Sequence, residues 1–492
     1  MSLDLFDHLH RHAADRGDEP AVRVIGPLAD QHEPLTWCRL NDQVCRVAAA
    51  LDRQLPPDAV VLLASPNRPA VAAAFLGVIA SGRSVFPVDA TLTAAEIEGL
   101  VGRAGVDAAI AHRSVADRLA GIDARVLDLD GLVASEDTSP DVQDRGERAW
   151  LLLQSSGTTG GPKIVRRSGP SLDAVAQNVA RAVGLRSEDR VVAAVPLSHS
   201  YGIENGMLAP IVAGACALHH VAQDDQPGRG FDPELAVTSG ATVLPGVPAM
   251  FEMIDRMQAG RGKLRLAYSA GAALPPELAH RLEQRDGLRL GQLYGSTEIG
   301  SVTYGPTPDS VGRPMGGVDV RILDADAPDP SQPLAPGLTG HVAVKAPSMF
   351  DGYLGPRALT DDSLVDGYFR TGDLGRLDDR GALHITGRLK LLIDVGGVKV
   401  NPLEVETVLA AHPQVNECVV VPDPVSPTIN RVKAVLTATS NDIDPSELRA
   451  FLRPRLAAHK IPRTFEVRAE LPKSPTGKVL RREVCSASQV SA

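Results

Sequence analysis

A short segment rich in glycine and hydroxyl side chains is the first candidate for chemistry in this sequence. Residues 154–163 read Gln-Ser-Ser-Gly-Thr-Thr-Gly-Gly-Pro-Lys and directly follow the apolar run Trp150–Leu153. Glycine lets a backbone approach an anion closely, and backbone N–H groups, hydroxyls and an ammonium group supply donors. The segment predicts a loop that wraps nucleotide phosphates, against the simpler interpretation of a flexible surface loop. It is not a Walker A loop, because Pro162 and Ile164 stand where that pattern needs Gly and Ser or Thr.

Two further segments place a carboxylate at a tight turn. Tyr294–Glu298 reads Tyr-Gly-Ser-Thr-Glu, and a carboxylate beside a phosphate loop can hold Mg²⁺ together with substrate phosphates. Asp373 follows Thr371-Gly372, which suits the binding of ribose hydroxyls, although Gly-Asp is also common in ordinary turns. In the last quarter, Lys390 follows Gly387-Arg388-Leu389, and Lys478 ends a Gly-bearing turn.

The order, spacing and identity of these segments resemble the acyl-adenylate-forming superfamily: acyl-CoA synthetases, adenylation domains and firefly-type luciferases. The resemblance runs from about Thr36 to Arg482 and is strongest to stand-alone acyl-CoA synthetases. It implies ATP-dependent activation of a carboxylic acid to an acyl-adenylate, followed by thioester formation with coenzyme A. ATP, Mg²⁺ and coenzyme A are the implied cofactors.

The resemblance also implies a role for individual residues. The implied nucleotide-binding residues are Ser155, Ser156, Gly157, Thr158, Thr159, Gly160, Lys163, Gly271, Ala272, Ala273, Tyr294, Asp373 and Arg388, with Tyr294 stacking on adenine and Asp373 and Arg388 holding ribose. The implied catalytic residues are Thr297 at the α-phosphate, Glu298 on Mg²⁺, Lys478 between carboxylate and α-phosphate, and His199 as a gate or pocket residue. The implied acyl pocket comprises His199, Tyr201, Gly202, Asn205, Val247, Ser269, Gly271 and Gly295. Gly396 and Gly397 resemble the glycines of a pantetheine tunnel, and Lys390 matches a hinge.

This chemistry is coherent on physical grounds. Hydroxide leaves a carboxylate badly, whereas joining the acid to AMP creates a mixed anhydride with a good leaving group. The two anions that must meet need neutralising charge, which Mg²⁺ on Glu298 and the Lys478 ammonium would supply. The sequence has no convincing Ser-His-Asp or Cys-His set, and none is required.

The apolar patterns predict an α/β fold. Strands such as Val60–Ala64 and Ser84–Val88 alternate with helices such as that at about 68–81, and Thr93 with Glu96 forms a capping box. We expect a large multi-layer N-terminal domain of parallel-type sheets and helices (1–388) and a small mobile α+β C-terminal domain (389–492). A Pro-rich stretch at about 325–340 is interpreted as a connector.

Composition excludes several functional classes. The net charge of −10 without a Lys/Arg stripe argues against nucleic acid, and five scattered cysteines argue against disulfides or zinc. No run of 18 apolar residues and no leader pattern occurs, so we expect a cytoplasmic protein without a membrane span. Monomer and homodimer both remain open.

Some residues depart from the family pattern. Ile164, Leu391, Asp394 and His341 stand where Gly, an acidic residue, Lys and Glu are usual, and β-branched Ile164 would stiffen the phosphate loop. One of the two half-reactions could therefore be weak. An acyl carrier protein is the alternative acceptor to coenzyme A. An amino-acid substrate is disfavoured by Ser198–Gly202, although Glu204 keeps it open. A non-catalytic adenylate-binding protein is disfavoured because Glu298, Asp373, Arg388 and Lys478 are all present.

Overall fold

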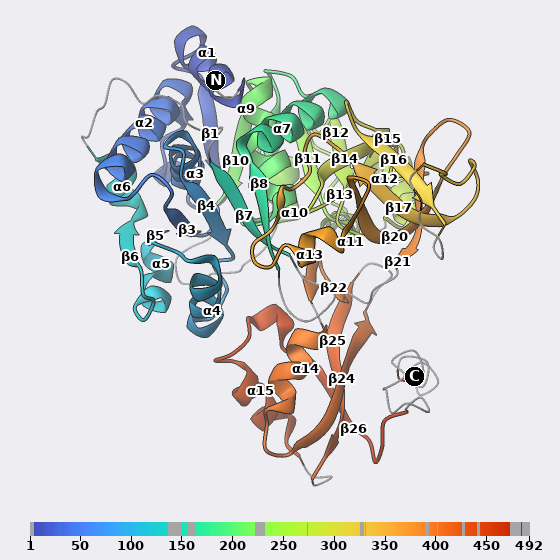
Figure 1. Ribbon diagram of the computed structural model, residues 1–492. Coiled ribbons are helices and arrows are strands. Elements are labelled where there is room, and N and C mark those ends of the chain that lie inside the picture. The colour runs from blue at the N-terminus through green and yellow to red at the C-terminus, as the bar shows by residue number, and fades with distance from the viewer. Residues whose placement is uncertain are drawn as a thin grey trace. The chain divides into compact units, whose positions relative to one another are not determined.

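Two largely parallel sheets and the helices around them form most of the molecule (Figure 1). The computed structural model describes residues 4–135, 149–155, 163–221, 232–272, 274–324, 329, 331–388, 393–400, 402–425, 429–439, 443–472 and 484. The chain divides into two compact units, the larger within residues 1–389 and the smaller within 390–492, with Thr91–Leu100 and a segment ending at Lys163 grouped with the smaller. The predicted fold class is confirmed: a mixed α/β large part with parallel sheets, and a small β-rich C-terminal part.

The first sheet has seven strands. Their order is β18 (Gly352–Tyr353), β8 (Lys163–Ser168), β7 (Trp150–Ser155), β4 (Ser84–Val88), β3 (Val60–Ala64), β5 (Ala108–Ala111) and β6 (Arg125–Asp128). The strands from β7 to β6 pair in parallel, and β18 pairs antiparallel with β8.

The second sheet has nine strands. Their order is β15 (Arg313–Pro314), β14 (Gly300–Gly305), β13 (Leu290–Ser296), β12 (Leu266–Ser269), β11 (Val243–Gly246), β9 (Arg190–Val192), β10 (Cys216–His220), β1 (Pro20–Ile25) and β2 (Leu35–Thr36). The strands from β13 to β1 are parallel, and β14, β15 and β2 are antiparallel additions at the edges.

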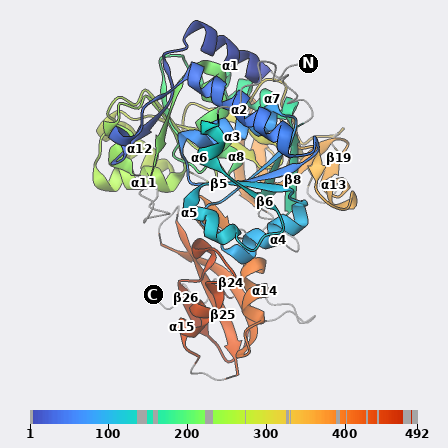
Figure 2. The same ribbon diagram turned by 90° about the vertical axis from the view of Figure 1, so that its left-hand side faces the viewer.

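Helices alternate with the strands along the chain. They are α1 (Asp4–Asp15), α2 (Trp37–Gln54), α3 (Pro69–Ala80), α4 (Ala94–Ala104), α5 (Arg113–Ala116), α6 (Leu129–Ala134), α7 (Gly169–Val183), α8 (Ser200–Ile203), α9 (Ala209–Ala213), α10 (Pro233–Thr238), α11 (Pro248–Met257), α12 (Pro276–Asp286) and α13 (Ala358–Asp361), with the short turns η1 (Ala29–Gln31), η2 (Asp117–Leu119) and the π-helical η4 (Glu204–Leu208). Helices α2, α3 and α6 pack together (Figure 2) and share one core cluster with strands of both sheets. Every residue of α3 from Val71 to Ala80 is buried, as expected of a helix that is apolar all round.

An antiparallel sheet completes the larger unit. It consists of β16 (Asp319–Leu323), β17 (Gly340–Lys345), β20 (Tyr368–Leu377) and β19 (Leu364–Val365), with β21 (Leu383–Arg388) paired to β20. Strands β16 and β17 pair with each other, so the Pro-rich stretch that the sequence suggested as a connector links two neighbouring strands of one sheet.

The smaller unit has its own core. It contains β22 (Ile393–Val395), β23 (Val398–Val400), α14 (Pro402–Ala410), β24 (Val415–Pro424), β25 (Asn430–Ala438), α15 (Pro445–Leu452), η5 (Ala458–Lys460) and β26 (Thr464–Val467). Strands β24, β25 and β26 form one sheet, on which α14 and α15 bury apolar side chains. The predicted boundary at 388–389 stays a prediction, since residues 389–392 lie outside the described part. Within the described residues, no helix combines the length and apolar character needed to cross a membrane.

Candidate functional site

The turn between β13 and β14 carries the predicted Mg²⁺ ligand. Gly295 and Gly300 approach so closely that a Cβ added at Gly295 would lie 2.2 Å from the Gly300 carbonyl oxygen, so the turn requires glycine there. Thr297 and Glu298 lie at its tip, and both are half-buried. This tight hairpin fixes where the two side chains can reach.

The Glu298 carboxylate is held by two hydroxyl donors. Ser296 Oγ donates to Oε2 over 3.1 Å, and the Tyr353 phenol donates to Oε1 over 3.1 Å. Burial raises the pKa of Tyr353, and the negative charge of Glu298 raises it further, so the phenol keeps its proton and remains a donor. Tyr353 was not found from the sequence, because a Gly-Tyr pair in a two-residue strand carries no signal of function.

The predicted adenine ligand contacts one of the two predicted ribose ligands. Tyr294 Oη donates to Asp373 Oδ2 over 2.7 Å, although the two residues lie 79 positions apart in the chain. Asp373 is 2% exposed, and it stands directly opposite Arg388 in the pairing of β20 with β21. Tyr294 lies on β13 of the nine-stranded sheet, whereas Asp373 and Arg388 lie on the paired strands β20 and β21 of the antiparallel sheet, so the residues that the sequence assigned to the nucleoside come from two sheets.

His341 supports the Asp373 turn. Its Nε2 accepts a hydrogen bond from the Gly372 N–H over 3.1 Å, so this nitrogen carries no proton. Thr371 Oγ1 donates to the Val342 carbonyl over 2.9 Å and accepts from the Asp373 N–H over 3.1 Å. The sequence marked His341 only as a departure from the family pattern, whereas the structure gives it a local role.

Several predicted pocket residues gather at the carboxyl ends of β11, β12 and β13. Gly246 stands opposite Ser269, and Ser269 stands opposite Gln292, so the segments that follow these strands are neighbours. A Cβ added at Gly271 would lie 3.8 Å from Val247 Cγ1. Crevices beyond the carboxyl ends of parallel strands are the usual ligand sites of open α/β sheets. The half-buried Ala272 belongs to the same segment as Gly271.

The remaining predicted pocket residues lie around α8. Burial lowers the pKa of His199, while Asp89, whose Oδ2 lies 3.9 Å from Nε2, acts in the opposite direction. Tyr201 donates to the Gly246 carbonyl over 3.2 Å, which ties α8 to the end of β11. Asn205 is buried and accepts from Tyr268 Oη over 3.0 Å. Tyr201, Gly202 and Asn205 border a void too narrow to admit water.

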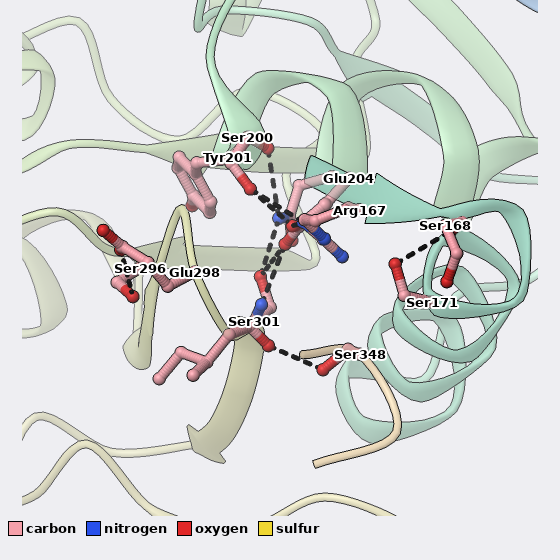
Figure 3. Close-up of polar contacts among 12 residues, drawn as sticks. Arg167, Ser168, Ser171, Ser200, Tyr201, Glu204, Ser296, Glu298, Ser301 and Ser348 are labelled. Atoms are coloured by element: carbon pink, nitrogen blue, oxygen red, sulfur yellow. Dashed lines mark hydrogen bonds and ion pairs between the residues drawn. The ribbon is translucent and has the colours of Figure 1, made fainter. Parts of the chain in front are cut away.

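Glu204 does not serve the role that the sequence left open for it. Its carboxylate is 1% exposed and is paired with the guanidinium of Arg167, which is also buried (Figure 3). A carboxylate that is already neutralised inside the protein is not available to a substrate ammonium group. The sequence could not reveal this, because the spacing of Arg167 and Glu204 gives no sign of contact.

The phosphate loop is described only at its two ends. Ser155 ends β7 and Lys163 begins β8, as expected for a loop between two strands. Ile164 is the second residue of β8 and is 4% exposed, so it lies in a buried strand position. Its expected effect on the loop stays a prediction, because residues 156–162 lie outside the described part. A β-branched residue suits a buried strand position. Predicted residues that lie outside the described part are Ser156, Gly157, Thr158, Thr159, Gly160, Ala273, Lys390, Leu391 and Lys478.

Two glycines of the smaller unit form a hairpin turn. Gly396 and Gly397 join β22 to β23 with φ values of +63° and +91°, which L residues with side chains rarely adopt. Asp394 Oδ1 accepts from the Gly397 N–H over 2.7 Å and stabilises this turn. The turn alone accounts for the two glycines, so their predicted contact with pantetheine stays a prediction.

The described residues fit a nucleotide better than an all-protein metal centre. The side-chain oxygens of Ser155 and Ser269 are buried and have no hydrogen-bond partner among these residues, so donors remain for a ligand. Within the same part of the chain, no group of three or more His, Cys, Asp or Glu side chains could hold a metal. A single carboxylate at Glu298 is typical of Mg²⁺ that is held jointly with phosphates.

Comparison with known proteins yields matches along nearly the whole chain. Residues 9–354 match the model of the AMP-binding enzyme family, and residues 404–478 match that of the AMP-binding enzyme C-terminal domain. A feruloyl-CoA synthase from an Amycolatopsis species is 31% identical over 92% of this chain and 93% of its own length. An oxalate–CoA ligase from Arabidopsis thaliana is 31% identical over 95% of each chain.

A solved structure adds a relative with a different kind of product. The amide bond synthetase McbA from Marinactinospora thermotolerans matches with a TM-score of 0.84 and 26% identity over 99% of both chains.

Proposed function

Because this chain belongs to the AMP-binding enzyme family, we propose that it is an AMP-forming acid–CoA ligase that activates a carboxylic acid with ATP and transfers the acyl group to coenzyme A. The observation that carries the proposal is the hydrogen bond from Tyr294 to Asp373, which stands opposite Arg388 in the strand pairing, in the same unit as the Glu298 turn. A nucleoside site and a magnesium-binding carboxylate are what adenylation requires.

The first half-reaction joins the acid to AMP. A carboxylate oxygen attacks the α-phosphorus of ATP, the bond to the bridging oxygen of the β-phosphate breaks, and pyrophosphate leaves. We assign the ribose to Asp373 and Arg388, the adenine face to Tyr294, and the α-phosphate to Thr297. Bound Mg²⁺ would neutralise charge on the phosphates. Ser296 and Tyr353 hold the Glu298 carboxylate in place for that ion.

The second half-reaction transfers the acyl group. The thiol sulfur of coenzyme A attacks the acyl carbon, the thiol proton is lost, and AMP leaves with both electrons of the anhydride bond. Lys478 between carboxylate and α-phosphate, Lys390 as a hinge, and Gly396 with Gly397 at pantetheine complete the proposed set. Ile164 gives no structural reason for a weak half-reaction, since it lies in a strand.

A second candidate function differs from the first in the nucleophile that accepts the acyl group. The likeness to an amide bond synthetase favours an amine as an alternative nucleophile toward the same acyl-adenylate. A carrier-protein thiol is the third acceptor to be compared.

One assay separates these outcomes. The purified protein is incubated with MgATP and a panel of carboxylic acids that includes ferulate and oxalate, and pyrophosphate release is measured. The best acid is then supplied with coenzyme A, a holo-carrier protein or a primary amine, and products are identified by mass spectrometry. We expect acid-dependent pyrophosphate release and an acyl-CoA product. A folded protein that releases no pyrophosphate with any acid contradicts the proposal, and an amide as the main product favours the second candidate.

A further inference from the structure

A buried ion pair lies within the larger unit (Figure 3). Arg167 on β8 is 0% exposed and Glu204 at the start of η4 is 1% exposed, and Arg167 Nη1 donates to Glu204 Oε1. Removing two charges from water costs several kcal/mol per ion, and apolar residues of similar size often give equal or greater stability. Arg167 Nε and Nη2 have no hydrogen-bond partner among the described residues, which makes the pair still less favourable. Stability is therefore a poor explanation for this pair.

The carboxylate of Glu204 joins three segments. Ser200 Oγ on α8 donates to Oε1 over 2.6 Å. On β14, the Ser301 N–H and Oγ donate to Oε2 over 2.9 and 2.6 Å. With Arg167 from β8, the contacts link the strand that leaves the phosphate loop, the predicted acyl segment and the strand that leaves the Glu298 turn.

The pair also touches the Glu298 turn directly. Gly300 has φ +68°, and a Cβ added there would lie 3.0 Å from Arg167 Nη2 and 3.2 Å from Glu204 Oε1. The end of the turn thus rests on the guanidinium and the carboxylate, two residues beyond Glu298.

A second set of contacts holds the same turn from β18 and the segment before it. Ser348 Oγ donates to the Ile299 carbonyl over 2.6 Å, and the Phe350 N–H donates to the Glu298 carbonyl over 2.7 Å. The main chain is therefore held at Glu298, Ile299 and Ser301 by these contacts, and Gly300 stands opposite Ser296 in the β13–β14 pairing and packs against the pair.

The local conformation at Glu204 is itself unusual. The helix widens into a π-helical turn from Glu204 to Leu208, and such turns occur frequently at functional sites. Asn205 in this turn also approaches the Ser301 hydroxyl, with Nδ2 3.4 Å from Oγ.

We propose that Arg167 and Glu204 are positioning residues that set the Thr297–Glu298 turn relative to the acyl segment and β8, so that formation of the acyl-adenylate depends on this pair. The inference rests on the proposed function and extends it to two residues that contact neither substrate. Misplacing reacting groups by about 1 Å can cost about a hundredfold in rate, so a small displacement of the turn is sufficient.

The test uses the complete chain and four variants. Ser301→Ala removes one donor to Glu204, and Glu204→Gln removes the charge. The double variant Arg167→Met/Glu204→Leu replaces the pair by apolar side chains. Ser171→Ala is the matched control, because Ser171 is also a buried serine but its hydroxyl does not contact the ion pair. It donates to the Ser168 carbonyl oxygen over 2.8 Å. For each protein, Tm, MgATP binding by calorimetry without acid, pyrophosphate release, and thioester formation from preformed acyl-adenylate are measured.

We expect Ser301→Ala to keep the wild-type Tm within a few degrees and to lower kcat for pyrophosphate release about tenfold or more, with weaker MgATP binding. Ser171→Ala should stay within about twofold of wild type in every readout. The double variant should fold at least as stably as Glu204→Gln, yet not recover pyrophosphate release, because Ser301 has lost its acceptor.

Two results overturn the inference: a double variant that adenylates like wild type, or Ser301→Ala that matches Ser171→Ala. Both presuppose an active wild type. A wild type that releases no pyrophosphate with any acid overturns the proposed function instead, so the two failures are distinguishable.

Discussion

At the scale of single residues, the candidate site is built from side chains that hold one another before any ligand binds. Glu298 is fixed by Ser296 and Tyr353, and Asp373 by Tyr294. Preorganised groups cost little reorganisation at the moment of reaction, which is how electrostatic stabilisation becomes effective. Substitution of the residues that hold the carboxylates therefore tests the candidate site as directly as substitution of the carboxylates themselves.

Tyr353→Phe tests this arrangement. The substitution removes the donor to Glu298 and keeps the ring, which packs edge-on against Phe350 with centroids 5.0 Å apart. Loss of one such hydrogen bond costs about 1 kcal/mol or somewhat more. We expect pyrophosphate release to fall about five- to tenfold and to need a higher MgCl₂ concentration for half-maximal rate. The measurement is a MgCl₂ titration of pyrophosphate release.

The control for this variant is Tyr368→Phe. Tyr368 also donates its phenol to a carboxylate, that of Asp319, but on the antiparallel sheet. An equal change in the MgCl₂ requirement of both variants would contradict the orienting role of Tyr353.

At the scale of secondary-structure elements, the apolar pattern and the capping residues predicted strands and a helix start correctly. The sequence did not predict which charged side chains are buried. The strands at Val60–Ala64 and Ser84–Val88 are confirmed with the predicted bounds, and Thr93 with Glu96 makes the expected reciprocal hydrogen bonds at the start of α4. Burial of a charged side chain, by contrast, leaves no trace in the pattern, because charged residues are normally exposed. The pairing of Arg167 with Glu204 was therefore missed.

Two further features of the site could not be predicted from the sequence: the contact between Tyr294 and Asp373, and the residue at which β8 begins. Asp373 could be placed beside a turn, but not beside Tyr294, because their contact depends on how two sheets are arranged. Ile164 was assigned to the loop because the glycine-rich motif carries no mark of where β8 begins. The sequence thus predicted the chemical groups of the candidate site, and the structure was needed to find which side chains contact them.

A substitution in the β22–β23 hairpin of the smaller unit tests the predicted contact of Gly396 with pantetheine. Gly396→Asn keeps a residue that tolerates positive φ, and nothing lies within 4 Å of the added Cβ. We expect the hairpin to form and the KM for coenzyme A to rise several-fold, since a side chain would narrow the predicted pantetheine path. The measurement compares thioester formation with pyrophosphate release.

Gly396→Val separates the turn requirement from the predicted contact. A β-branched residue is strained at φ +63°, so this variant should also lose thermal stability. If Gly396→Asn forms thioester with the wild-type KM, then the glycine serves the turn alone.

At the scale of the whole molecule, one buried histidine makes folding stability depend on pH. His219 on β10 is fully buried, and burial lowers its pKa from 6.5 to about 4. Above pH 6.5 the imidazole is neutral in both the folded and the unfolded state, so stability is greatest there. Between pH 6.5 and about 4 the unfolded state binds a proton that the folded state refuses, and stability falls as the pH falls.

The expected loss from this residue is about 2 kcal/mol on going from pH 7.5 to pH 5. It is measured as the difference in urea unfolding free energy between wild type and His219→Gln, which cannot titrate. Because other groups change equally in both proteins, the variant should show the smaller loss. Equal losses in the two proteins would mean that His219 is protonated in the folded state.

The bond between Tyr294 and Asp373 has a consequence for how a nucleotide would be selected. The Tyr294 phenol already donates a hydrogen bond to Asp373 Oδ2, as a hydroxyl group of a bound ligand would. A ribose that binds there exchanges one hydrogen bond for another, and such an exchange contributes little net affinity. On the proposed function the carboxylate would contribute discrimination, because an incoming group that cannot replace the phenol would gain no hydrogen bond from that oxygen.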